Sequence, residues 1–200
     1  MKLLLTSTGL KNKKIKEQFL QLLNKEISEV KVIFIPTASR YEEELQFVTI
    51  SKNELLDLGI LAENILTLSL EEKVNYSDLA DFDVIYVCGG NTFYLLKKVR
   101  ESDFDKVMNE FAKADKLYVG ASAGNILPGP NIDIASPFDE NDVGLTDLKG
   151  LCLTDIVASP HYEDKDVGII EPFTRKFKVV PLTDDQALFI DGEKVEVINN

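Results

Sequence analysis

Short and almost unbroken apolar runs are the feature that most restricts the fold of this chain. The run from Val30 to Ile35 reads V-K-V-I-F-I, and the run from Asp83 to Val87 reads D-V-I-Y-V. Strands that are apolar on both faces are typical of a parallel sheet covered by helices on both sides. Similar runs predict further strands at Lys2 to Leu5, Ile65 to Leu68 and Leu117 to Val119.

Segments with helical spacing of apolar residues alternate with these runs. They cover Asn12 to Asn24, Tyr41 to Leu58, the stretch after Thr92, and Phe104 to Phe111, where Ser102 can serve as the N-cap. The alternation predicts an α/β fold with a mainly parallel sheet sandwiched by helices. In such a fold, functional groups gather at the carboxyl ends of the strands.

The second half of the chain has a different pattern. Asn131 to Asp147 is acidic and irregular, which predicts a loop, and Leu151 to Val157 is a candidate strand. The tail reads A-L-F-I-D-G-E-K-V-E-V-I, which predicts two strands joined at Asp191-Gly192 as a hairpin at the sheet edge. A length of 200 residues predicts one domain over positions 1–200.

Composition narrows the possible functions. The chain has 34 acidic and 22 basic side chains, and a net charge of -12 disfavours binding to nucleic acid or to a membrane surface. No apolar stretch is long enough for a membrane span or a signal peptide. The two cysteines, Cys88 and Cys152, form no C-x-x-C pair, so we expect no disulfide framework, no metal cluster and a cytoplasmic location.

The segment G-A-S-A-G after the run Leu117 to Val119 predicts a nucleophile. A serine in G-x-S-x-G after a strand is held on a sharp strand-to-helix turn, so Ser122 is the candidate. The chain has one histidine, His161, and a serine hydroxyl needs an adjacent base to react at neutral pH. We therefore expect His161 to be that base, and activity to fall as its imidazole protonates. The alternative is a small-residue turn where a helix packs closely on a sheet.

Three motifs together resemble a known family. They are C-G-G-N-T-F-Y-L-L from Cys88, G-A-S-A-G-N from Gly120 and S-P-H-Y from Ser159. In this order they are similar to the serine peptidases related to dipeptidase E and, more distantly, cyanophycinase. The resemblance implies a flavodoxin-like fold similar to class I glutamine amidotransferases. It also implies hydrolysis of short peptides near the amino terminus, with Ser122 as nucleophile and His161 as base.

An oxyanion hole requires two backbone N–H donors near the nucleophile. Ala123 supplies one directly after the serine, and Gly90 is the candidate for the other, with Gly89 close behind. Asn91 is a further candidate for substrate binding in this loop. The alternative for the glycines is a plain βα turn, and Asn91 can equally cap the following helix.

Two acidic residues are candidates for the third member of a catalytic triad, the carboxylate beside the histidine. Asp133 lies in P-N-I-D-I-A, in the region where dipeptidase E carries an N-D-M-P segment, and Asp184 lies where cyanophycinase-like members carry an acid. Either carboxylate would fix the imidazole tautomer. Asp185 and Glu163 are weaker alternatives.

The expected substrate is a short peptide. Ile126 to Leu145 contains no Arg or Lys, so a preference for amino-terminal aspartate, as in dipeptidase E, is not expected from this region. Asp139 or Glu140 would instead suit a free amino group. The side chains of Arg175 and Lys176 could reach the pocket and pair with a substrate carboxylate. The alternative is that they are exposed charged residues on a helix, which is the more common case. We expect no cofactor, and the sequence leaves monomer and homodimer open.

Other classes of protein share parts of this pattern. An α/β-hydrolase esterase shares G-x-S-x-G, but its late histidine does not fit His161, which some forty residues follow. An amidotransferase-like enzyme using Cys88 is disfavoured because that cysteine directly follows a strand. A catalytically silent binding domain of the amidotransferase type remains an alternative.

Overall fold

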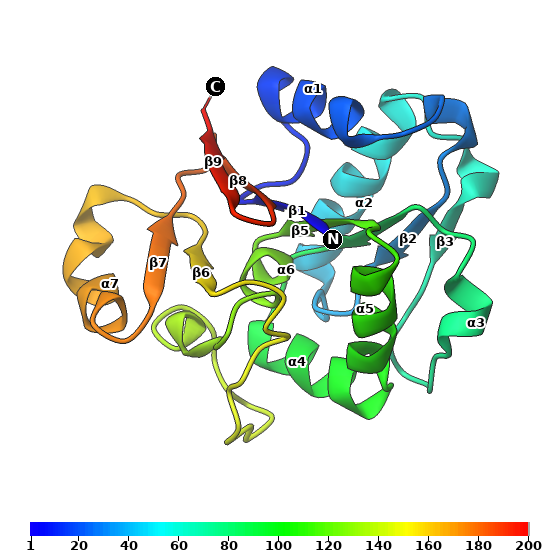
Figure 1. The fold of residues 1–200 in the computed structure, drawn as a ribbon. Helices are drawn as coiled ribbons and strands as arrows, with labels where there is room; N and C mark the ends of the chain where they lie inside the picture. Colours follow the sequence, from blue (N-terminus) through cyan, green and yellow to red (C-terminus); the bar gives the residue numbers. More distant parts are fainter. Residues whose placement is uncertain (200) are drawn as a thin grey trace.

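The computed structural model describes residues 1–199 and contains a central sheet with helices on both faces (Figure 1). Its order is β3-β2-β4-β5-β1-β8-β9, within the described residues. The five strands from β3 to β1 are parallel, β8 pairs antiparallel with β1, and β9 pairs antiparallel with β8. The strands are β1 (Lys2–Thr6), β2 (Val32–Ile35), β3 (Ile65–Thr67), β4 (Val84–Val87), β5 (Leu117–Ala121), β6 (Ile156–Ser159), β7 (Lys178–Pro181), β8 (Ala187–Asp191) and β9 (Lys194–Ile198).

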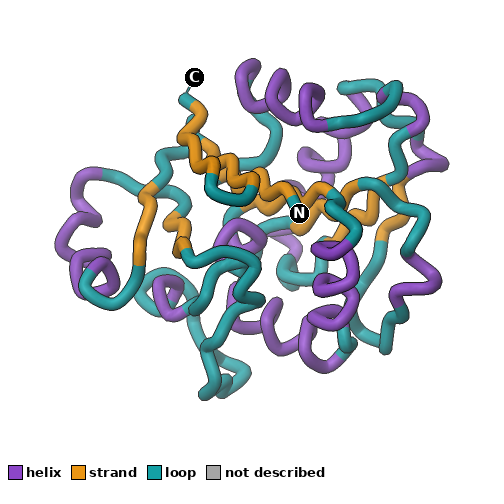
Figure 2. Tube along the Cα trace, in the orientation of Figure 1, coloured by secondary structure: helices purple, strands orange, loops and turns teal. Residues whose placement is uncertain are grey.

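The helices form two layers around this sheet, as the tube view shows (Figure 2). The α-helices are α1 (Lys13–Leu22), α2 (Glu42–Asp57), α3 (Tyr76–Leu79), α4 (Thr92–Glu101), α5 (Phe104–Lys113), α6 (Ala123–Ile126) and α7 (Val167–Thr174). Short 3₁₀ helices cover Ile27–Glu29, Ala62–Asn64, Asp133–Ala135 and Asp164–Asp166. The predicted α/β architecture with a mainly parallel sheet is confirmed.

Alternate residues of the strands fill two separate cores. In β2, Ile33 and Ile35 pack with α4 and α5, whereas Val32 and Phe34 pack with α1 and α2 on the other face. Such alternation follows from the two-residue period of a strand. Because both faces are covered, the strands are apolar throughout, which explains the unbroken runs in the sequence.

Most predicted elements are confirmed, but Ser102 does not begin α5. Its backbone N–H donates to the Lys98 carbonyl oxygen at 2.9 Å, so Ser102 continues the turns of α4. The reversal occurs at Asp103, which has a positive φ of 60° and precedes α5. Asn91 does cap α4, since its side chain accepts a hydrogen bond from the Tyr94 backbone N–H.

A small parallel pair, β6 and β7, lies beside the main sheet with α7 next to it (Figure 1). The strand expected from Leu151 begins only at Ile156. The preceding residues bind the loop after α6 instead, since the Leu151 N–H donates to the Leu127 carbonyl and the Leu153 N–H to the Pro128 carbonyl. The sequence reading missed β7 and α7. The hairpin of β8 and β9 at the sheet edge is confirmed.

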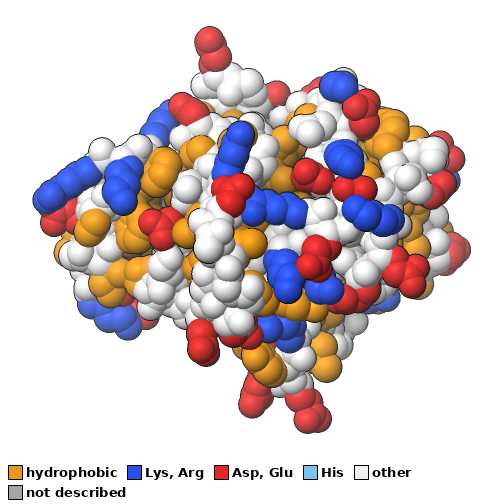
Figure 3. Space-filling model, turned by 90° about the horizontal axis from the view of Figure 1, so that it is seen from below, with side chains coloured by type: hydrophobic (Ala, Val, Ile, Leu, Met, Phe, Trp, Pro, Cys, Tyr) orange, Lys and Arg blue, Asp and Glu red, His pale blue; other side chains and the backbone are white. Residues whose placement is uncertain are grey.

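Acidic and basic side chains are interspersed on the face covered by α4 and α5 (Figure 3). No continuous basic surface, of the kind that binds phosphate backbones, is visible on this face. Among the described residues, no helix combines the length and the apolar composition that a membrane span requires.

The turn after β4 passes unusually close to the turn after β2. Gly90 has a φ of +131°, and a Cβ atom placed there would lie 2.1 Å from the Ala38 carbonyl oxygen. The two turns are joined by hydrogen bonds from the Asn91 N–H to the Ala38 carbonyl and from the Ser39 hydroxyl to the Gly89 carbonyl. Only glycine fits at position 90, both in conformation and in space.

We therefore expect Gly90→Ala to lower the free energy of unfolding by about 2 kcal/mol or more. The matched control is Gly168→Ala in α7, where nothing lies within 4 Å of the added methyl group. That control should leave stability unchanged or raise it by up to about 1 kcal/mol. Urea titration of both variants measures the difference, and equal stabilities would contradict the packing described for Gly90.

Glu54 of α2 is a carboxylate enclosed by the fold. Its side chain is buried and accepts the Leu10 backbone N–H at 2.9 Å, which ties α2 to the loop after β1. Burial raises the pKa of Glu54 above its usual value. The folded state therefore binds this proton more tightly than the unfolded chain does, and the corresponding stabilisation is lost as the pH rises through the folded-state pKa.

Glu54→Gln keeps a carbonyl oxygen for the Leu10 N–H but removes the charge. We expect the variant and the parent protein to be about equally stable near pH 3, where Glu54 is protonated in both folded and unfolded states. The variant should then gain a growing advantage toward pH 8. Thermal denaturation across this range tests the prediction, and a stability difference that does not change with pH would contradict it.

Candidate active site

Ser122 lies on the sharp turn between β5 and α6. Its backbone has a φ of 51° and a ψ of -112°, a conformation that non-glycine residues rarely adopt. The glycines on either side of this turn are required by space. A Cβ atom at Gly120 would lie 2.1 Å from the Gly124 carbonyl oxygen, and one at Gly124 would lie 2.3 Å from the Val87 carbonyl oxygen. The G-A-S-A-G segment therefore lets α6 pack directly on the sheet and leaves Ser122 half-buried.

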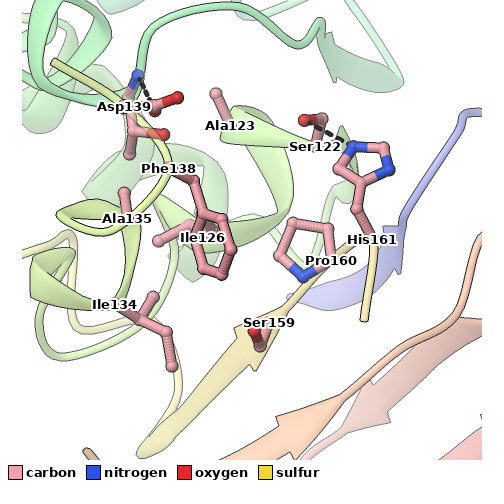
Figure 4. Close-up of a pocket in the computed structure, with 11 residues that line it drawn as sticks. Ser122, Ala123, Ile126, Ile134, Ala135, Phe138, Asp139, Ser159, Pro160 and His161 are labelled. Carbon is pink, nitrogen blue, oxygen red and sulfur yellow. Dashed lines mark hydrogen bonds between the residues drawn. The ribbon is translucent and has the colours of Figure 1, made fainter. Parts of the chain in front are cut away.

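His161 follows β6 and lies next to Ser122. Its Nε2 atom is 2.9 Å from Ser122 Oγ, and its Nδ1 atom is 2.6 Å from Asp184 Oδ1. The imidazole thus bridges the hydroxyl and the carboxylate (Figure 4 shows its bond to Ser122). The side chains of His161 and Asp184 are 49% and 62% exposed, so the ring and the carboxylate are open to solvent.

Among the described residues, no hydrogen bond or ion pair joins the carboxylate of any other candidate acid to His161. Asp133 accepts a hydrogen bond from the Ser136 hydroxyl at 2.8 Å within its own 3₁₀ turn. Glu163 forms an ion pair with Lys165, and the Asp185 carbonyl accepts a bond from the Asn12 side chain. Of the two acids that the sequence left open, Asp184 is the one beside the imidazole.

The turn after β4 approaches Ser122 from the neighbouring strand. A Cβ atom at Gly89 would lie 2.9 Å from the Ser122 Cβ atom, so the glycine allows this contact. Ala123 opens α6, where the first N–H groups of a helix have no partner within it. Gly89 thus lies against Ser122, Gly90 follows it in the same turn, and Ala123 follows the serine at the start of α6. Asn91, in contrast, caps α4 and donates its amide to the Glu140 carbonyl, so both sides of its amide group bind the protein.

A cavity of about 110 Å³ opens beside Ser122 and His161. Phe138 and Ile126 lie across its middle, and Asp139 lies on the wall away from His161 (Figure 4). Asp139 accepts the Thr92 backbone N–H at 2.8 Å with one carboxylate oxygen. The residues that line the cavity are Thr92, Ser122, Ala123, Ile126, Ile134, Ala135, Phe138, Asp139, Ser159, Pro160 and His161.

The basic residues near this region are engaged with other groups. Arg175, which the sequence suggested for the pocket, pairs with Glu171 on α7 and is 75% exposed. The sequence reading missed Arg40, whose guanidinium pairs with Asp142 through two bonds of 2.8 and 3.2 Å and lies 4.5 Å from the Tyr94 ring centroid. Arg40 thereby ties the acidic loop to the body of the protein.

Cys88 is an unsuitable nucleophile in this structure. It is 2% exposed, and burial raises the pKa of its thiol well above the usual value. Within residues 1–199, no group of three or more His, Cys, Asp or Glu side chains is placed to bind a metal ion.

Comparison with known proteins identifies the family of this chain. The model of peptidase family S51 matches residues 3–198. An uncharacterized peptidase of Listeria monocytogenes is 38% identical over 173 residues, covering 82% of this chain and 83% of the relative. A Peptidase E of Escherichia coli is 29% identical over 164 residues, covering 80% of this chain and 68% of the relative.

Solved structures show the same fold. A crystal structure of a Listeria monocytogenes protein, named as a candidate Peptidase E, superposes with a TM-score of 0.85 at 32% identity and covers 100% of this chain and 98% of that one. A peptidase from an acI-B1 actinobacterium has a TM-score of 0.69 at 17% identity, covering 100% of this chain and 87% of its own, and shows the fold alone. The chain therefore belongs to peptidase family S51, the serine peptidase family that includes the Peptidase E proteins.

Proposed function

We propose that this serine peptidase hydrolyses short peptides near their amino terminus, with Ser122, His161 and Asp184 as its catalytic triad. The proposal rests on two contacts of His161. Its Nε2 atom lies 2.9 Å from Ser122 Oγ, and its Nδ1 atom lies 2.6 Å from Asp184 Oδ1. Both distances are within hydrogen-bonding range, and the order of groups is that of a serine nucleophile with an oriented base.

The reaction begins when His161 Nε2 accepts the proton of the Ser122 hydroxyl. The serine oxygen then attacks the carbonyl carbon of the peptide bond, and the Ala123 and Gly90 N–H groups stabilise the oxyanion. Asp184 holds Nδ1 protonated and stabilises the imidazolium. His161 passes its proton to the leaving amine as the C–N bond breaks, which leaves an acyl-enzyme. A water molecule, deprotonated by His161, releases the acyl group and restores the serine.

The size and lining of the cavity support a short substrate. A volume of about 110 Å³ is well below that of pockets for drug-sized ligands and suits one short side chain. No Lys or Arg is among the described residues that line it, so a substrate carboxylate finds no ionic partner there. Asp139 supplies a negative charge on the wall and has one oxygen bound to the Thr92 N–H. The Asp139 carboxylate would attract the charged amino group at the amino terminus of a substrate.

The triad predicts a graded loss of activity. Ser122→Ala should lower kcat by at least about 10³-fold on any peptide that the parent protein cleaves, because the nucleophile is lost. Asp184→Asn should lower kcat by about 10²- to 10⁴-fold, because an amide no longer favours the productive tautomer. Asp133→Asn is the matched control and should retain the parent rate. Steady-state hydrolysis measures all three, and full activity in Ser122→Ala would refute the proposal.

The wall of the cavity predicts a preference for peptides with a free amino terminus. Short peptides with varied first residues should be cleaved faster than their N-acetylated forms, because acetylation removes the charge that Asp139 favours. Asp139→Asn keeps an oxygen for the Thr92 N–H and should raise KM for free peptides by about 10-fold, with little change for acetylated ones. Equal KM values for free peptides in both proteins would remove Asp139 from substrate binding.

A further inference from the structure

The three residues at the end of β1 each contact one member of the proposed triad. The Thr6 carbonyl accepts the Ser122 backbone N–H at 3.1 Å. The Ser7 hydroxyl accepts the His161 backbone N–H at 3.2 Å. The Thr8 hydroxyl donates to the Asp184 carbonyl at 2.8 Å. This segment, Thr6–Thr8, thus connects three positions that are 39 and 23 residues apart in the sequence.

The main sheet holds the segment Thr6–Thr8 firmly in place. Thr6 is paired with Ala121 of β5 on one side and with Ala187 of β8 on the other, in the middle of the main sheet. Both Thr6 and Ser7 are fully buried. The Asn125 side chain adds a second bond to the Thr6 carbonyl at 3.0 Å. The end of β1 and the turn that carries Ser122 are therefore one rigid unit.

His161 and Asp184 come from a different part of the fold. His161 follows β6 and Asp184 follows β7, and these two strands form their own small sheet. Their side chains are about half exposed, so packing against neighbours does not fix them. The backbone of both loops must instead be held by hydrogen bonds, and His161 has in addition a positive φ of 58°.

The Ser7 hydroxyl joins both of these loops to the main sheet. Besides accepting the His161 N–H, it donates to the Leu182 carbonyl at 3.0 Å. That same carbonyl accepts the Tyr162 N–H at 3.0 Å, directly after the histidine. The hydroxyl of Ser7 therefore binds the loop after β6 and the loop after β7 at once, and it adds to the direct bonds between these two loops.

We infer that Ser7 and Thr8 are positioning residues, which hold His161 and Asp184 at the distance from Ser122 that catalysis requires. The inference rests on the proposed function for its consequence on rate. Catalysis is sensitive to small displacements, since a misplacement of about 1 Å can cost about 10²-fold in rate. Neither Ser7 nor Thr8 lines the cavity itself, so substrate binding should be little affected.

Thr8 allows a sharp test, because valine removes the hydroxyl with little change in volume, whereas serine keeps the hydroxyl and loses only the methyl group. Thr8→Val deletes the bond to the Asp184 carbonyl, and Thr8→Ser keeps it. We expect Thr8→Val to lower kcat by about 10-fold or more with KM within about twofold of the parent value, and Thr8→Ser to retain the parent kcat. Ser7→Ala should lower kcat by about 10²-fold. Ser102→Ala is the control for loss of a buried serine hydroxyl, which there donates to the Val99 carbonyl, and it should retain the parent kcat.

The single histidine gives a second readout that needs no substrate. The chain has one imidazole, and a proton on His161 Nδ1 that is hydrogen-bonded to Asp184 should give one resolved low-field signal in the proton NMR spectrum of the parent protein and of Thr8→Ser. Thr8→Val and Ser7→Ala should shift or lose this signal. Parent-like signals and parent-like kcat in both variants would overturn the inference.

A parent protein that cleaves no peptide would count against the proposed function, and the NMR comparison would still decide the role of Ser7 and Thr8. If Ser7→Ala does not fold, the comparison of Thr8→Val with Thr8→Ser tests the inference by itself.

Discussion

The bridge that His161 makes between Ser122 and Asp184 is the interaction on which the proposed chemistry depends. It joins two separately built parts of the protein, because Ser122 lies on the main sheet whereas the other two residues follow the strands of the small sheet. Neither part alone holds a nucleophile together with its base. The hydrogen bonds that link the parts therefore matter as much for the site as the side chains that form it.

The main sheet contributes a strained but firmly held nucleophile. Backbone strain of this kind persists only where the surroundings fix it, and here Gly120 and Gly124 let the backbone of α6 pack directly against that of the sheet. Gly89 and Gly90 bring the turn of the adjacent strand against the same spot. The carboxyl ends of β1, β4 and β5 thus meet around Ser122, as expected for ligand sites in open α/β sheets.

The sequence was sufficient for the parts of the fold that have a strong local pattern. The unbroken runs in β2 and β4 predict buried parallel strands, and the turn at Asp191-Gly192 predicts the final hairpin. The helix α7 was missed because it contains Pro172 and has a short apolar stripe, and β7 was missed because it is partly exposed and ends in a proline.

The sequence was less informative about the site. Ser122 and His161 could be proposed from the sequence because the motif is local and the histidine is unique. The choice between Asp133 and Asp184 depends on how the small sheet docks on the main one, and no local pattern encodes that docking. The roles inferred for Ser7 and Thr8 depend on contacts across more than 150 residues of sequence, so they emerge only from the three-dimensional arrangement.

Labelling with a fluorophosphonate tests the central claim most directly, because the reagent reacts with a serine only where a base activates it. The account predicts one adduct, which peptide mapping by mass spectrometry places on Ser122, and which is absent in Ser122→Ala and strongly reduced in His161→Gln. No adduct on the folded parent protein, or an adduct on another serine that persists in both variants, would contradict the account.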